Sequence, residues 1–168
     1  MAISLRDMRR LAEADEYERR ALEFSRQAGD KRVQAMARAG RAELSLMGGD
    51  PQMAHAGARL AADAYTEIHD VAGIADANRL AGVALAAMDS TADALESLNR
   101  AVALARESGT ALVEAESLEA RSKLLATMGA RSQALVDASS AQAIYKRLGA
   151  TEELATLEES IQQLKHDR

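Results

Sequence analysis

Residue types that bind metals or act as nucleophiles are few in this chain and stand far apart. There are three histidines, His55, His69 and His166, and no cysteine. None of the histidines pairs with another histidine or a carboxylate at the spacing that places two metal ligands on one helix face. The sequence therefore predicts no metal site and no bound cofactor.

Two short motifs have the composition of functional elements but are typical of turns. His69-Asp70 fits a residue that ends one helix, followed by a residue that caps the next. Gly48-Gly49-Asp50 lacks the preceding strand and the following lysine and serine of a phosphate-binding loop. No nucleophile elbow is present either. We therefore expect that the chain is not an enzyme, unless an active site lies in another domain.

The composition indicates an all-α protein. The 168 residues are 48% hydrophobic and only 2% aromatic, with a single proline, so alanine supplies much of the apolar content. Alanine is the strongest helix former and lets helices pack closely. The net charge of −5 argues against a nucleic-acid partner, which requires a basic surface. Because no signal peptide and no membrane span of about 20 apolar residues is evident, we expect a cytoplasmic protein without a membrane partner.

Residues that end helices recur every twenty positions. Glycine, and at modest cost histidine and aspartate, adopts the left-handed conformation that commonly stops a helix. Five polar residues directly follow such a stop and are expected to cap the next helix, namely Asp30, Asp50, Asp70, Ser90 and Thr110. The stops are Gly29, Gly49, His69, Asp89, Gly109, Gly129 and Gly149. The predicted helices cover residues 4–28, 31–47, 51–68, 71–88, 91–107, 111–128, 131–147 and 151–166.

Alignment of the chain in steps of 40 residues shows columns of small side chains. Such columns let neighbouring helices lie close together, and larger apolar residues are expected to fill the remaining space between layers. The larger residues include Phe24, Leu104, Ile144, Ile68 and Leu148. Three columns are alanine throughout, namely Ala14, Ala54, Ala94 and Ala134; Ala21, Ala61, Ala101 and Ala141; and Ala35, Ala75, Ala115 and Ala155. A fourth holds Ala42, Gly82 and Ser122.

These columns resemble those of tetratricopeptide repeats of the longer, roughly 40-residue variety. The family has a small residue in its first helix, matched by Ala42, Gly82 and Ser122, and alanines in its second helix. The closing proline of the family is absent here, and the family's large apolar residue is replaced by Arg38 and Asn78 in two of three repeats. The extended second helix is similar to repeats of bacterial signalling and transcription regulators and of kinesin light chains.

The resemblance implies a right-handed α-solenoid of antiparallel helix hairpins, with about eight helices in a single domain over residues 1–168. Each hairpin alone leaves an apolar stripe uncovered, so stacking of the hairpins supplies the core. The expected units are a lone N-terminal helix (1–29), three repeats (30–69, 70–109 and 110–149) and a C-terminal capping helix (150–168).

In this family the first helix of each hairpin lines a concave surface that binds partners. Asp76, Arg79 and Val83 share one helix face by their spacing, as do Glu116, Glu119 and Lys123. The resemblance carries the groove over to Met36, Glu43, Met47, Asp76, Arg79, Val83, Glu116, Glu119 and Lys123. The alternative for Glu119 and Lys123 is a simple surface pair worth tenths of a kcal/mol, in which case Glu119→Ala is nearly neutral.

The sequence favours a protein–protein interaction scaffold that binds a peptide or a partner protein. One alternative is a regulatory or sensor segment of a larger signalling or transcription-regulator protein. Another is a self-assembling module that forms homo-oligomers through its terminal helices. Members that grip a peptide's terminal carboxylate use basic residues and an asparagine in a column that reads Gly40, Leu80 and Ala120 here, which disfavours that mode.

Overall fold

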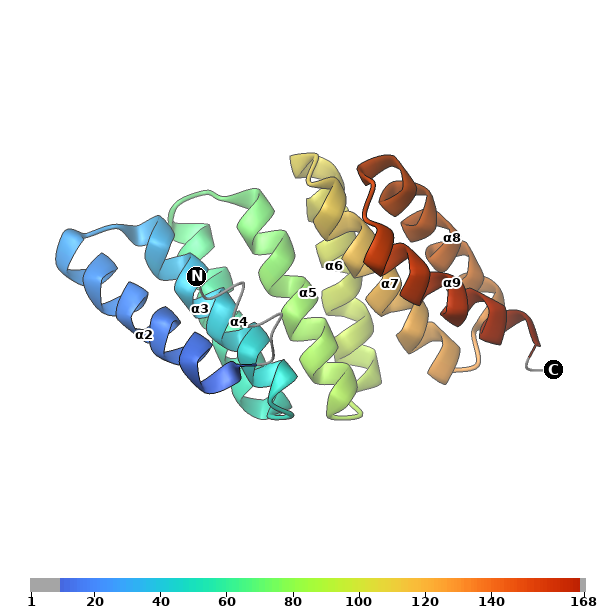
Figure 1. Cartoon of the computed structure of the whole chain (residues 1–168), viewed down its shortest axis with the longest axis horizontal. Helices are drawn as coiled ribbons and strands as arrows, with labels where there is room; N and C mark the ends of the chain where they lie inside the picture. Colours follow the sequence, from blue (N-terminus) through green and yellow to red (C-terminus); the bar gives the residue numbers. More distant parts are fainter. Residues whose placement is uncertain (1–9, 167–168) are drawn as a thin grey trace.

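Helices follow one another along the whole of the described chain. In a computed structural model that describes residues 10–166, these residues form eight α-helices that run from α2 at one end of an elongated stack to α9 at the other (Figure 1). Each helix packs against the next. The chain is therefore an all-α helical repeat solenoid, as predicted. The helices are α2 (Leu11–Ala28), α3 (Lys31–Met47), α4 (Pro51–Glu67), α5 (Val71–Ala87), α6 (Thr91–Ser108), α7 (Ala111–Thr127), α8 (Arg131–Leu148) and α9 (Thr151–His166).

The helix boundaries match the predicted ones closely. From α3 to α9, every helix begins at the predicted residue and ends within one residue of the predicted end. The first helix differs, because α2 begins at Leu11 with Arg10 as its flanking residue. Residues 4–9 of the predicted first helix lie outside the described residues. None of the described helices is both long enough and apolar enough to cross a lipid bilayer.

All seven predicted stops are left-handed. His69 and Asp89 have φ values of 54° and 59°, and the five glycines have φ values between 69° and 78°. At each stop the following residue donates its backbone N–H to a carbonyl five positions back, as Asp30 does to Ser25 at 2.8 Å and Ala150 does to Tyr145 at 3.1 Å. This pairing satisfies carbonyls that the last helical turn leaves open. The twenty-residue period of the sequence thus corresponds to the positions at which one helix ends and the chain turns into the next.

The predicted N-caps are confirmed at three aspartates and wrong at two hydroxyl residues. Asp30, Asp50 and Asp70 each accept a hydrogen bond from the backbone N–H three residues on, at 2.9–3.0 Å. Ser90 and Thr110 make no side-chain capping bond. The Thr110 hydroxyl instead forms a 2.8 Å hydrogen bond with the hydroxyl of Ser108. Nothing in the structure explains why Ser90 does not cap α6.

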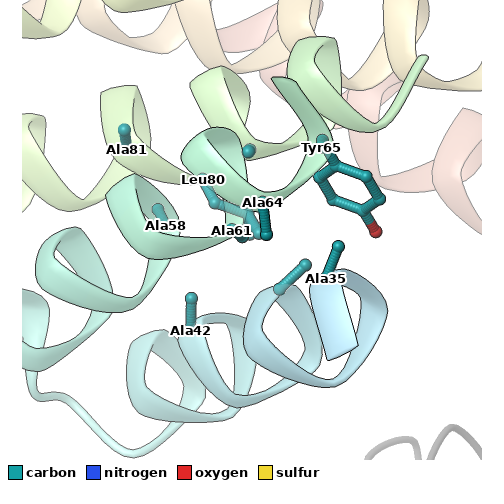
Figure 2. Packing of buried hydrophobic residues seen from close by; sticks show 10 residues of the cluster. Ala35, Ala42, Ala58, Ala61, Ala64, Tyr65, Leu80 and Ala81 are labelled. Carbon is teal, nitrogen blue, oxygen red and sulfur yellow. The ribbon is translucent and has the colours of Figure 1, made fainter. Parts of the chain in front are cut away.

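The alanine columns form the core. Ala14, Ala54, Ala94 and Ala134 are all fully buried. Around α3, α4 and α5, small side chains from all three helices meet with the larger Tyr65 and Leu80 filling the gaps between them (Figure 2). Because one methyl group occupies little space, these helices pack with their backbones close together. The repeat alignment therefore corresponds to a repeated packing layer.

Three residues that were expected in the core are exposed to solvent. Phe24 is 67% exposed and Leu148 is 46% exposed, although Ile144, in the same column as Phe24, is buried. Phe24 belongs to α2, which packs mainly on α3 among the described helices, and Leu148 is the last residue of α8. Ala155 is exposed because α9 packs mainly against α8 and has no following helix in the described chain to cover it. Within residues 10–166, the end units thus have fewer helix neighbours than the internal repeats.

Tyr65 closes the α4–α5 junction. Its ring lies against Gly73, where an added Cβ would stand 2.2 Å from the Cδ1 atom of Tyr65, so only glycine leaves room for the ring. Burial, together with the negative charges of Asp76 and Asp70, raises the pKa of Tyr65 to about 12. The phenol is therefore held in its neutral form in the folded protein.

This burial predicts a loss of stability in alkali. An unfolded tyrosine releases its proton near pH 10, whereas folded Tyr65 keeps it to about pH 12. Between these values the unfolded chain binds fewer protons, so the stability that is present below about pH 10 falls as the pH rises. Urea unfolding at about pH 9 and about pH 11 should show this fall, and Tyr65→Phe should reduce it. An identical fall in both proteins would contradict the assignment.

Candidate functional site

One row of helices forms the inner side of the solenoid. The first helices of the three hairpins contact one another, α3 with α5 and α5 with α7, in addition to their hairpin partners. The second helices α4, α6 and α8 show no comparable mutual contact in the described residues. In a curved stack, the row whose helices lie closer together is on the inside of the curve. The predicted groove helices are therefore the inner row.

A cavity of about 490 Å³ lies between α5 and α7, and we call it the α5–α7 groove. Its apolar wall consists of Val83, Ala86, Leu98, Ala120 and Leu124. Charged and hydroxyl side chains complete the lining, and they come from α5 to α9 and from the turn after α5. They are Arg79, Asp89, Thr91, Glu116, Glu119, Lys123, Thr127, Tyr145 and Glu153.

Arg79 links two neighbouring repeats at one end of the groove. It donates to Asp76 one turn earlier on α5, from Nε at 2.9 Å and from a terminal nitrogen at 2.7 Å. Its Nε also lies 3.2 Å from a carboxylate oxygen of Glu116 on α7. Burial opposes the charge on Arg79, but the two carboxylates outweigh it and raise the pKa of the guanidinium. One partly buried cation is thus shared by two acids.

In this group of charged residues, Glu116 is the one whose charged form is disfavoured by its surroundings. Burial raises its pKa, and the nearby carboxylates of Asp76, Glu43 and Glu119 act in the same direction. Arg79 lowers the pKa but does not cancel these effects. The charge of the Glu116 carboxylate is therefore only partly compensated within the groove.

Glu119 is held at the other side of the groove by two donors. Lys123 donates from Nζ at 2.6 Å, and the buried Tyr145 donates its hydroxyl at 2.9 Å. Burial, together with the negative charge of Glu119, raises the pKa of the Tyr145 phenol. Glu119 therefore connects α7 to α8 through Tyr145, in addition to forming the pair with Lys123.

These contacts change the expected effect of Glu119→Ala. The variant leaves the buried Tyr145 hydroxyl without its acceptor and should lower the free energy of unfolding by about 1 kcal/mol. Glu119→Gln keeps an oxygen acceptor and should lose less. Thermal melts of both variants, beside the exposed control Glu96→Ala on α6, measure the difference. Equal midpoints for all three would contradict the role of the Tyr145 hydrogen bond.

The structure brings together five of the nine predicted groove residues. Arg79, Val83, Glu116, Glu119 and Lys123 all line the α5–α7 groove. Asp76 contacts the groove only through Arg79.

The three predicted groove residues on α3 fall outside the cavity lining. They are Glu43, Met36, which is 56% exposed, and Met47, which is 45% exposed. The cavity lies between the second and third repeats, whereas these residues belong to the first. The observed cavity therefore involves fewer repeats than the predicted binding surface.

Tyr145, Asp89 and Glu153 are groove residues that the sequence analysis missed. They lie outside the first helices of the three repeats, to which all nine predicted groove residues belong. A signal was present for two of them. Tyr145 stands two repeats after Tyr65, and Glu153 is the charged member of a column that otherwise reads Val33, Gly73 and Val113.

No group of three or more metal-binding side chains occurs within residues 10–166. His69 occupies a helix stop, and His55 lies on α4 with a buried Nδ1 that has no hydrogen-bond partner. The two histidines are not members of the groove lining. The groove lining thus offers carboxylates, two cations, three hydroxyl groups and an apolar wall.

A comparison with models of protein families found no match to this chain, and a comparison with curated proteins found none either.

Proposed function

We propose that this chain is a tetratricopeptide-type interaction module that binds a peptide or a helix of a partner protein in the α5–α7 groove. The proposal depends chiefly on one observation, the cavity of about 490 Å³ with an apolar wall and a charged rim. Ligand sites commonly have this size and combine apolar walls with a few placed polar groups.

The arrangement of the repeats supports the proposal. The packing columns are nearly constant from repeat to repeat, whereas the inner-row positions vary, as in Met36, Asp76 and Glu116. Constant positions maintain the stack, and variable positions on a shared face are free to recognise a partner.

A charged side chain on the apolar wall tests the proposal. Val83→Glu places a carboxylate among apolar residues and should abolish capture of partners by the immobilised protein. Val136→Glu is the matched control, because Val136 is 65% exposed on α8 and does not line the groove. Capture that is unchanged by Val83→Glu, in a protein whose melt shows that it remains folded, would exclude the groove as the binding site.

A further inference from the structure

Acidic groups outnumber basic groups in the α5–α7 groove. Its lining contains four carboxylates, which belong to Asp89, Glu116, Glu119 and Glu153, and two cations, which belong to Arg79 and Lys123. Both cations already have acidic partners, since Arg79 pairs with Asp76 and Glu116 and Lys123 pairs with Glu119. The groove therefore has no basic side chain left to bind an acidic ligand.

Two of the groove carboxylates have no ion pair in residues 10–166. Asp89 lies in the turn after α5, and Glu153 lies in the first turn of α9. Neither of them takes part in a salt bridge or a side-chain hydrogen bond of the described chain, and both are exposed. They remain available to a group that enters from solvent.

At the Arg79 end of the groove, a single cation faces two carboxylates. Arg79 serves both Asp76 and Glu116, and burial still raises the pKa of Glu116. A second cation near Glu116 would compensate a charge that the protein itself compensates only in part. In a partly buried site, such pairing is worth more than it is on an open surface.

Between these carboxylates the wall is apolar. Val83, Leu98 and Leu124 line the cavity together with the small side chains of Ala86 and Ala120. Removing an aliphatic or aromatic side chain from water against this wall is favourable in proportion to the apolar surface that is buried. The cavity thus offers an apolar contact within reach of acidic groups.

From this complementarity we infer that the groove binds a segment of another protein that carries a lysine or arginine next to an aliphatic or aromatic residue. The apolar side chain of the segment packs on the apolar wall around Val83, and its cation approaches the groove carboxylates. This inference rests on the proposed function and specifies the chemistry of the partner.

Selection from a displayed library of random peptides tests the inference and the proposed function separately. The whole chain is the bait, and the Val83→Glu variant removes peptides that do not need the groove. Enrichment of peptides with basic residues beside apolar ones supports the inference. Enrichment of acidic or uncharged peptides overturns it but leaves the proposed function standing. If no peptide depends on Val83, both are overturned.

A charge-matched pair of double variants then locates the interaction. Asp89→Asn with Glu153→Gln removes the two unpaired groove charges, and asparagine is tolerated at the left-handed Asp89 position. Asp93→Asn with Glu152→Gln removes two exposed charges that do not line the groove. The first pair should weaken binding of an enriched basic peptide at least roughly threefold, and the second should not. Equal weakening would indicate general charge attraction and overturn the inference.

Discussion

Gly82→Leu should destabilise the protein severely, by a few kcal/mol. Gly82 lies on the face of α5 that packs against α6. A Cβ at this position would stand 2.6 Å from Cγ of Leu98, 2.9 Å from its Cδ2 and 3.2 Å from the carbonyl oxygen of Ala94. Leu98 is itself buried, so neither it nor the helix backbone can move aside cheaply. Chemical unfolding monitored by circular dichroism gives the change in free energy.

Alanine substitutions at two buried helical glycines provide the control. Both Gly82→Ala and Gly40→Ala gain up to about 1 kcal/mol of intrinsic helix propensity. At Gly40 the nearest atoms to an added Cβ belong to the carboxylate end of the Glu18 side chain, which is flexible. Gly40→Ala should therefore be neutral or stabilising, and Gly82→Ala should be destabilising. Similar results at the two sites would mean that the α5–α6 contact is looser than described.

Arg121→Met should lower the free energy of unfolding by about 2–3 kcal/mol. Arg121 on α7 donates to both carboxylate oxygens of Asp137 on α8, at 2.6 and 2.8 Å, and to the side-chain oxygen of Asn99 on α6 at 2.8 Å. The Asp137 side chain is only 9% exposed, so the variant leaves a nearly buried carboxylate without its cation. Denaturant unfolding at neutral pH measures the loss.

Two further variants test whether the uncompensated, nearly buried carboxylate of Asp137 causes this loss of stability. In Arg121→Met combined with Asp137→Leu no uncompensated charge remains, and stability should return to within about 1 kcal/mol of the parent protein. Arg41→Met removes a comparable 2.8 Å pair with Asp15, but both side chains are nearly half exposed. Its effect should be below about 0.5 kcal/mol. If Arg41→Met costs as much as Arg121→Met, burial is not the reason.

Local chemistry made much of the fold predictable. A residue such as Gly29 or Asp89 ends a helix because of its own backbone preferences, so the period of twenty located the helix ends without knowledge of the neighbours. The Asp30, Asp50 and Asp70 caps depend only on residues three positions away. Thr110 shows the limit, because its hydroxyl group bonds to the Ser108 hydroxyl within the same short segment instead of capping α7.

The groove was predictable only in part. Helical spacing placed Arg79 and Val83, and likewise Glu116, Glu119 and Lys123, on common faces, and all five line the cavity. The family resemblance also included Met36 and Met47, which lie outside the cavity lining, and neither argument identified Tyr145 or Glu153. Spacing along one helix identifies a face, but not which other helices stand opposite.

The sequence alone determined where the helices begin and end, which small residues form the packing columns and that the chain stacks as repeats. These properties follow from backbone preferences and from periodicity within a hairpin. Only the tertiary structure decided that Arg79 is shared between two repeats, that Glu119 accepts from Tyr145 and that Phe24 lies in solvent. Burial and charge pairing depend on distances between segments that are remote in sequence, and these distances exist only once the helices are stacked.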